Sequence, residues 1–220
     1  MKTQIDGAPA FAHLQVVLDP GEAIMAESDA MASMSADLSM RTQLNGGLFG
    51  ALARRLFGDE SMFINRFQNH SQGPRQLTLV QPTPGDMLCR ELAAQEIYYL
   101  QPGAFVACEP SVEIGLRWAG LVSFIAREGL FKLSITGPGR VWYGAYGALL
   151  ERQIDGEFIV DTSHLVAYEP GIQLRLQLAG GLFSSLFGGE GLVTRVLGRG
   201  KVVIQTRSLS GLSGWLNSKL

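Results

Sequence analysis

Three histidines, His13, His70 and His164, are the residues whose type could hold a catalytic metal ion. They stand far apart in the chain, with no His-x-His pair and no Glu at metal-binding spacing in the same predicted strand. A cupin-like metal oxygenase needs two histidines and a carboxylate gathered at one site. The pattern therefore favours surface or core histidines, and no cofactor is predicted. A cupin-like, small-molecule-binding enzyme with its metal on His70 or His164 stays as an alternative.

Nucleophile and phosphate-binding motifs are also incomplete. Ser61, Ser134 and Ser163 stand in no Gly-x-Ser-x-Gly elbow, the turn that exposes the nucleophile of α/β-hydrolases. Gly137-Pro-Gly139 and Gly198-Arg-Gly200 resemble phosphate loops, but no helical pattern and no Lys-Ser or Lys-Thr pair follows them. Such glycine motifs between strands are typical of hairpin turns. We find no catalytic constellation and predict that the chain is not an enzyme.

Three glutamates recur at corresponding places, and they are Glu60, Glu128 and Glu190. As functional groups they would be ligand or acid–base residues. A reaction rarely needs three equivalent acids, so the recurrence favours a structural corner. We expect each carboxylate to accept backbone N–H hydrogen bonds at a tight turn, which is a charge-assisted arrangement.

The elements that would position these residues form one series that repeats three times. Each series runs from an alternating strand through a glycine-rich apolar stretch and a Glu corner to a second strand and a glycine turn. The last copy is the clearest, because Ile172, Leu174 and Leu176 alternate with polar residues, as in a strand with one buried face. The pattern predicts an all-β protein of three tandem, diverged β-sandwich repeats, at residues 1–82, 83–146 and 147–220, packed as one compact unit.

The two ends of the chain carry weaker patterns. Residues 1–12 are predicted to be a loose leader before a strand that begins near His13. The tail, residues 211–220, is predicted to form one helical turn around Trp215 and Leu216.

The glycine-rich apolar stretches are the sharpest candidates for function. If residues 46–58 form a short helix, their apolar side chains lie on one side of it, and residues 180–188 repeat the spacing. One interpretation is a lid over the sandwich core or a subunit contact. The other is a patch that touches a membrane surface or a protein partner, since exposed apolar patches mark interaction sites. The candidate residues are Leu48, Phe49, Leu52, Leu56, Phe57, Leu182, Phe183, Leu186 and Phe187.

Composition narrows the classes of partner. The 220 residues are 46% hydrophobic and only 17% charged, which indicates a packed chain whose surface is partly covered by other subunits or a membrane. A net charge of −2 gives no general basic field for nucleic acid, although Arg41, Arg117 and Arg175 recur on corresponding strands. Cys89 and Cys108 have no metal-like spacing and are predicted to be reduced thiols. The longest uncharged apolar run, residues 118–126, is too short to cross a bilayer.

Five stretches carry a resemblance to a known family: Pro20-Gly-Glu-Ala-Ile24, Ala26-Glu-Ser-Asp-Ala-Met31, Gly46-Gly-Leu-Phe49, Gly189-Glu-Gly-Leu192 and Val203-Ile-Gln-Thr-Arg207. Together they resemble the bacterial and mitochondrial proteins named for altered inheritance of mitochondria, also called mitochondrial biogenesis proteins. The resemblance covers nearly the whole chain. It implies a repeated β-sandwich similar to the tryptophan RNA-binding attenuation protein, a fold that makes rings by joining sheets edge to edge. It supplies no catalytic residues. Because the chain shows no transit-peptide pattern, it resembles a bacterial, cytoplasmic member.

These observations lead to one preferred hypothesis and two alternatives. We expect a non-enzymatic, homo-oligomeric binding or scaffold protein, because open sheet edges must be covered and edge-to-edge assembly covers them. A trimer is expected by analogy with the rings of the fold. The alternatives are an RNA-binding ring and the cupin-like enzyme.

Overall fold

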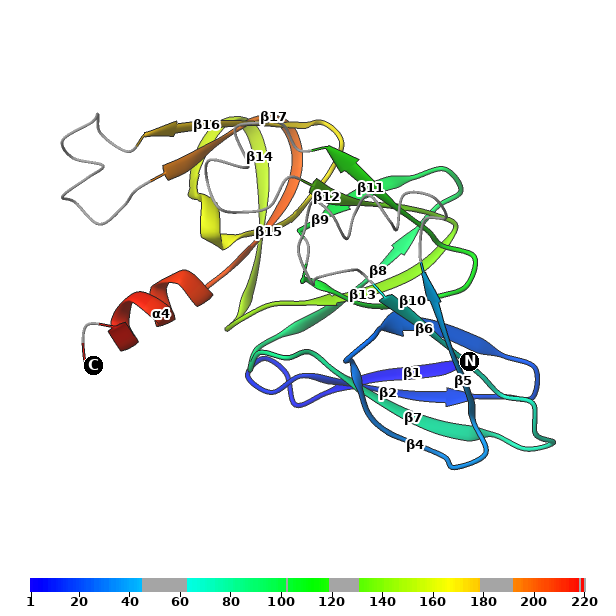
Figure 1. Cartoon of the computed structure of the whole chain (residues 1–220). Helices are drawn as coiled ribbons and strands as arrows, with labels where there is room; N and C mark the ends of the chain where they lie inside the picture. The colour runs from blue at the N-terminus through cyan, green and yellow to red at the C-terminus, as the bar shows by residue number, and fades with distance from the viewer. Residues whose placement is uncertain (45–62, 102, 119–130, 179–191, 218, 220) are drawn as a thin grey trace.

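The computed structural model describes residues 1–44, 63–101, 103–118, 131–178, 192–217 and 219. This part of the chain is mostly β, with three antiparallel sheets, a 3-10 turn, η1 (Thr162–His164), and a short helix, α4 (Leu209–Asn217). Figure 1 shows the first sheet at the bottom and the third at the top, with α4 projecting to one side. The prediction of an all-β fold is confirmed.

The first sheet has one face on a core, because its apolar residues alternate. In β2 the buried residues are Leu14, Val16 and Leu18, and the residues between them are half-buried. The strand nearest the N-terminus pairs with β2 along its whole length, so the expectation of a loose leader over residues 1–12 was wrong. The spatial order is β1 (Lys2–Asp6), β2 (His13–Leu18), β7 (Arg75–Val80) and β4 (Met31–Met34).

The second sheet is a shared layer between two cores. All four residues of its central strand β10 are buried, as in strands covered on both faces. Val106 and Ala107 belong to the first core, against the first sheet, whereas Phe105 and Cys108 belong to the second core. The spatial order is β5 (Ser39–Leu44), β6 (Phe63–Gln68), β3 (Ala23–Glu27), β10 (Phe105–Cys108), β13 (Gly139–Gly144) and β8 (Met87–Leu92).

The third sheet repeats this layering one step further along the chain. Its central strand β15 is buried throughout, with Val166 and Ala167 in the second core and Leu165 and Tyr168 in the third. The spatial order is β11 (Glu113–Trp118), β12 (Phe131–Thr136), β9 (Ile97–Leu100), β15 (Leu165–Tyr168), β17 (Leu192–Gln205) and β14 (Leu149–Asp161), and β16 (Ile172–Leu178) also pairs with β17.

Two opposed glycines let the long β14–β17 ribbon enclose the third core. Gly156 lies opposite Gly198, and their φ angles of +112° and +118° are in the region that only glycine adopts easily. At Gly198 a Cβ atom would also meet the carbonyl oxygen of Gly171 at 2.3 Å. Ile154 and Val160, on either side of Gly156, both reach the third core. The ribbon therefore bends at this pair and supplies both sides of that core.

Helix α4 is longer than the single turn expected around Trp215, and it buries none of its residues. Leu209 and Trp215 are 59% and 60% exposed. In the described part of the chain, no helix has the length and apolar character needed to cross a membrane.

Candidate functional site

All residues of the two predicted interaction loops lie outside the described residues. The nine apolar candidates from Leu48 to Phe57 and from Leu182 to Phe187 fall there, as do the corner residues Glu60, Glu128 and Glu190. The strands that carry these loops are described. The candidate site consists of the hairpins β5–β6, β11–β12 and β16–β17 and the spaces beside them.

The structure does not bring the three histidines together. The Nδ1 atom of His164 lies 2.6 Å from the carbonyl oxygen of Gln205, and that of His13 lies 3.4 Å from the carbonyl oxygen of Phe11. His70 is exposed. Among the described residues, no group of three His, Cys, Asp or Glu side chains is placed to hold a metal ion.

The two cysteines are free thiols in different settings. Cys89 is exposed, whereas Cys108 is buried in the second core. Burial raises the pKa of the Cys108 thiol to about 12, and the Glu109 carboxylate adds to the effect. Cys108 is therefore a neutral thiol at ordinary pH, which suits packing and not nucleophilic attack.

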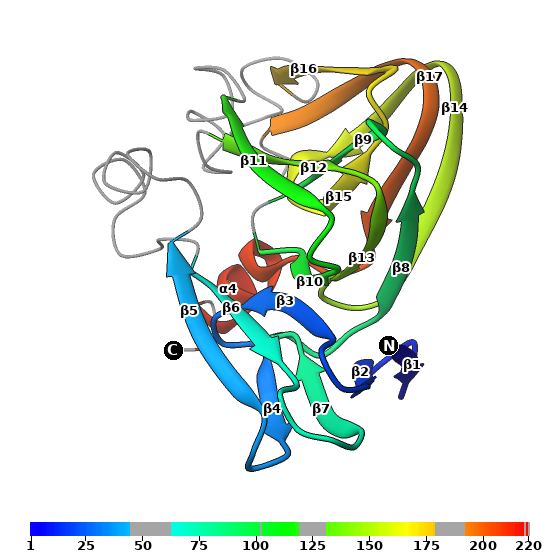
Figure 2. The same cartoon turned by 90° about the vertical axis from the view of Figure 1, so that its right-hand side faces the viewer.

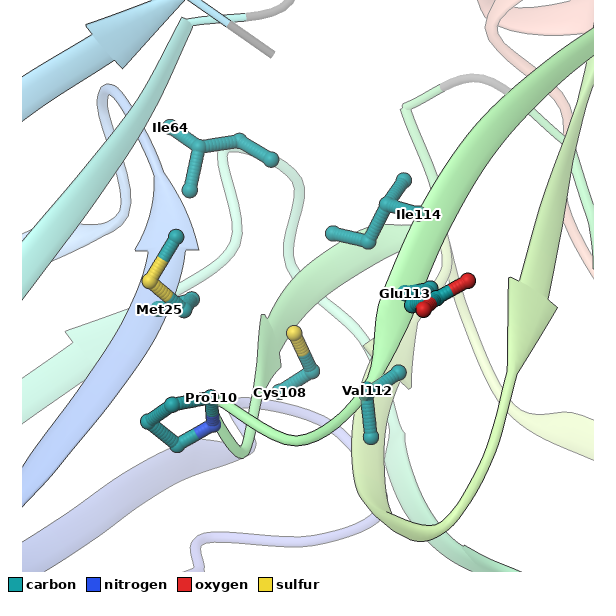
Figure 3. A pocket seen from close by; sticks show the side chains of 7 residues that line it. All are labelled: Met25, Ile64, Cys108, Pro110, Val112, Glu113 and Ile114. Carbon is teal, nitrogen blue, oxygen red and sulfur yellow. The ribbon is translucent and has the colours of Figure 1, made fainter. Parts of the chain in front are cut away.

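A pocket of about 370 Å³ lies where strands β3, β6 and β10 of the second sheet meet β11, the edge strand of the third sheet. Figure 3 shows Met25 and Ile64 on one side and Ile114 on the other, with Cys108 and Pro110 below; Glu113 points away from the space. Its volume is at the lower end of the range for ligand pockets, which is about 300–1,000 Å³. Its side chains are apolar apart from Cys108 and Glu113, and because Glu113 points away from the space, few side chains could orient a substrate.

A second set of strands in the same order carries larger side chains at the corresponding positions. Strands β12, β9 and β15 lie side by side as β6, β3 and β10 do. Tyr99 lies opposite Tyr168, just as Met25 lies opposite Cys108. The Nζ atom of Lys132 lies 3.8 Å from the centre of the Tyr99 ring and donates a hydrogen bond of 2.9 Å to the Tyr168 hydroxyl.

Lys132 is also one of two cations on neighbouring strands. It lies directly opposite Arg117 in the β11–β12 pair. Burial lowers the pKa of the Lys132 amine, and the positive charge of Arg117 lowers it further. A cation pair also stands at the register Arg41↔Arg66 in the β5–β6 pair, so the arrangement is not confined to one hairpin.

Corner carboxylates do exist, but at residues that sequence reasoning missed. The Oε2 atoms of Glu96, Glu109 and Glu169 accept backbone N–H hydrogen bonds of 2.8 to 2.9 Å from Ala93, Arg140 and Lys201, respectively. Glu96 and Glu169 also both accept hydrogen bonds from Arg90, at 2.8 and 3.0 Å, and the Arg90 bond holds the pKa of Glu96 below its ordinary value. The recurring Glu-Pro dipeptide at 109–110 and 169–170 could have indicated two of them.

Apolar side chains are exposed on both faces of β14 where it borders no second strand of the described chain. Phe158 is 40% exposed and Ile159 is 52% exposed. The residues at the register of Phe158 in β3 and β9 are Ile24 and Tyr98, and both are completely buried. No sequence pattern separated these positions, because all three strands are apolar there.

Comparison with known proteins gives one family and bacterial relatives. The family model described as Mitochondrial biogenesis AIM24 matches residues 3–207. An uncharacterized protein of Streptococcus pyogenes serotype M6 is 28% identical over 229 residues, which cover 100% of this chain and 91% of that protein. The crystal structure of protein SPYM3_0169 from Streptococcus pyogenes matches with a TM-score of 0.79 and 28% identity, covering 100% of this chain and 99% of the other.

Proposed function

The chain belongs to the mitochondrial biogenesis AIM24 family, and from that premise we propose that it is a non-enzymatic, homo-oligomeric scaffold built from three copies of one β unit. Its copies join through sheet edges, both inside the chain and between chains. The exposed edge of β14 is the observation that carries this proposal.

Strand pairing supports three copies. Taking six strands per copy, the first pairs with the sixth, the second with the fifth, the third with the sixth and the fourth with the fifth. In the third copy, β14 supplies the first two strands and β17 the last two. In the first copy the four pairings, in this order, are β2–β7, β3–β6, β4–β7 and β5–β6. In the second copy they are β8–β13, β9–β12, β10–β13 and β11–β12. In the third copy β14–β17 provides the first and second pairings, β15–β17 the third and β16–β17 the fourth.

Neighbouring copies join in the same way at both junctions. The second strand of one copy pairs with the third strand of the next, as β3 does with β10 and β9 with β15. The equivalent second strand of the third copy is residues 156–161 of β14, and the equivalent third strand of the first copy is β4. Among the described residues, these two strands pair only with β17 and β7. A second copy of the chain, placed head to tail, would complete both edges.

Exposure of apolar side chains supports this contact. Ile24 shares the first core with Val106 and Ala107 of the next copy, and Tyr98 shares the second core with Val166 and Ala167 of the next copy. Within the described residues, Phe158 and Ile159 are exposed and belong to no core cluster. Met31 on β4, the edge that would meet them, is 36% exposed. Burial of these side chains in an assembly would stabilise it by the hydrophobic effect. A head-to-tail contact closes into a ring when its rotation permits, and we propose a trimer by analogy with the rings of the attenuation-protein fold.

The scaffold's outward contact is proposed to lie on the Gly-Gly-Leu-Phe loops. Their apolar sequences, Gly46-Gly-Leu-Phe49 and Gly180-Gly-Leu-Phe183, fit contact with a membrane surface or a protein partner. A cytoplasmic location is part of the same proposal.

The experiment is light scattering of the purified protein at micromolar concentration. The wild type is expected at the mass of a trimer, and Ile159→Lys, which places a charge in the contact, at the mass of a monomer. Gln153→Lys is the matched control, because Gln153 is exposed on the same strand but lies outside residues 156–161. A monodisperse wild-type monomer would refute the proposal.

A further inference from the structure

Each hairpin formed by the fourth and fifth strands carries two cations directly opposite each other. The three registers are Arg41↔Arg66, Arg117↔Lys132 and Arg175↔Arg195. Like charges directly opposite on paired strands destabilise a sheet. The whole chain has only 18 Lys and Arg residues against 20 acidic ones, so three such pairs are not the result of a generally basic surface.

Only some of these cations interact with a carboxylate or an aromatic side chain nearby. Arg195 forms an ion pair of 2.6 Å with Glu157, and Lys132 is held by two tyrosines. The fourth-strand residues Arg41, Arg117 and Arg175 are exposed and make no ion pair with any carboxylate in the described ranges. Every hairpin therefore presents one exposed arginine beside a second cation. This arrangement favours an external anion that approaches both.

The three arginines lie on the outermost strands, and those strands end on one side of the molecule. Figure 2 shows the arrowheads of β5, β11 and β16 all directed toward the left-hand side. Arg41 and Arg175 are three residues from the ends of their strands, and Arg117 is one residue from its end. At about 3.3 Å per residue, all three lie within roughly 10 Å of those ends. One extended anionic surface could therefore meet the three hairpins together.

We propose that Arg41, Arg117 and Arg175 bind the phosphate groups of an anionic lipid bilayer. The inference rests on the membrane contact within the proposed function and names its chemistry. The sequences that join the paired strands are apolar, with Gly-Gly-Leu-Phe in two of the three hairpins, which fits contact with lipid. Juxtaposed arginines supply the matching attraction to lipid phosphates. Single-stranded RNA is disfavoured, because it needs stacking aromatics beside the cations, and Lys132 already covers Tyr99.

The test compares vesicles of phosphatidylglycerol mixed with phosphatidylcholine against vesicles of phosphatidylcholine alone. Wild-type protein is expected to float with the anionic vesicles and to detach as salt is added. The triple variant Arg41→Gln, Arg117→Gln, Arg175→Gln should bind them about a hundredfold more weakly, from about fivefold for each arginine. The control triple variant Arg152→Gln, Arg199→Gln, Arg207→Gln changes net charge equally at other exposed arginines and should stay within about twofold of the wild type.

Each other outcome overturns the inference. Equal losses in the two triple variants would show attraction to bulk charge only. Equal wild-type binding to both vesicle types would leave the apolar loop contact standing but remove the role of the arginines. Retention of single-stranded RNA without binding to anionic vesicles would assign the arginines to nucleic acid. Light scattering of both variants at the wild-type mass shows that fold and assembly are intact, which separates this test from that of the scaffold.

Discussion

The hydroxyl groups of Tyr98 and Tyr143 lie 3.2 Å apart inside the second core, where they join the second and third sheets. Their rings are tilted by 52° with centroids 5.8 Å apart, so the contact is both polar and aromatic. Tyr143→Phe removes one partner and leaves the buried Tyr98 hydroxyl unpaired. We expect a loss of about 1–3 kcal/mol in the free energy of unfolding by urea denaturation. Tyr146→Phe, at a half-buried residue, is the control and should change it by less than about 0.5 kcal/mol.

Alkaline pH should unfold the protein through its buried acids. Burial raises the pKa of Tyr98, Tyr143 and Tyr168, and raises that of Cys108 to about 12 from 9.0. A raised folded pKa means that the unfolded chain loses its proton first, so stability is full below the unfolded pKa and falls above it. For Cys108 the loss begins near pH 9 and grows by about 1.4 kcal/mol per pH unit until about pH 12. Urea denaturation from pH 7 to 11 measures it, and Cys108→Val should flatten the curve between pH 9 and 10. An identical curve for that variant would contradict the assignment.

Phe158 and Ile24 provide a matched pair for the assembly. Ile24→Ser creates a cavity and a buried hydroxyl, and should reduce the free energy of unfolding by about 3 kcal/mol or more at any protein concentration. Phe158→Ser should leave a dilute sample nearly unchanged. At high concentration it should remove the rise in melting temperature that assembly gives the wild type. A loss with Phe158→Ser as large as that with Ile24→Ser, even in dilute solution, would place Phe158 in a core.

Glu169 links β8 of the second sheet to β17 of the third sheet. It accepts hydrogen bonds from Arg90 of β8 and from the backbone N–H of Lys201 in β17. Glu169→Ala should lower the free energy of unfolding by about 1–3 kcal/mol, because it removes one of the two carboxylate acceptors of Arg90 and leaves the backbone N–H of Lys201 without its acceptor. Asp155→Ala should change little, since its ion pair with Arg199 is 3.6 Å long and exposed on both sides. Similar losses in the two variants, measured by thermal melts at matched salt, would show that Glu169 does not carry the link.

Phe49 and Phe183 test the loops directly. If they contact a membrane or a partner, Phe49→Ser and Phe183→Ser should leave the melting temperature nearly unchanged, because exposed side chains lose little on substitution. Both should lose flotation with anionic liposomes or association with the partner. A loss of about 3 kcal/mol or more in unfolding free energy, with no liposome binding by the wild type, would make the two rings part of a core.

Most of the fold prediction came from the alternation of apolar and polar residues along the strands, and the errors of the prediction have physical causes. Strands such as β2 alternate because one face is buried, which is visible in the sequence. On β16 the alternation misleads, since Leu174 is 36% exposed. β1 was missed because its half-buried residues at Lys2–Asp6 alternate weakly and gain their order from pairing with β2. The opposed cations were visible as single arginines, but their partners depend on register, which no local pattern sets. The exposure of Phe158 depends on which strands lie beside β14, and the local sequence of β14 does not show that.

The pairings of β3 with β10 and of β9 with β15 also bear on how the chain reaches its fold. Pairing of Met25 with Cys108 and of Tyr99 with Tyr168 joins residues that are far apart in sequence, so these contacts form late and folding is expected to be slow. Until β10 pairs with β3 during folding, the edge of β3 exposes unpaired backbone N–H and C=O groups to which a neighbouring chain can bind. Since the contact within a chain and the proposed contact between chains use equivalent strand edges, crowded nascent chains could exchange whole copies with one another. Refolding at high concentration should therefore yield domain-swapped species that refolding of dilute protein avoids.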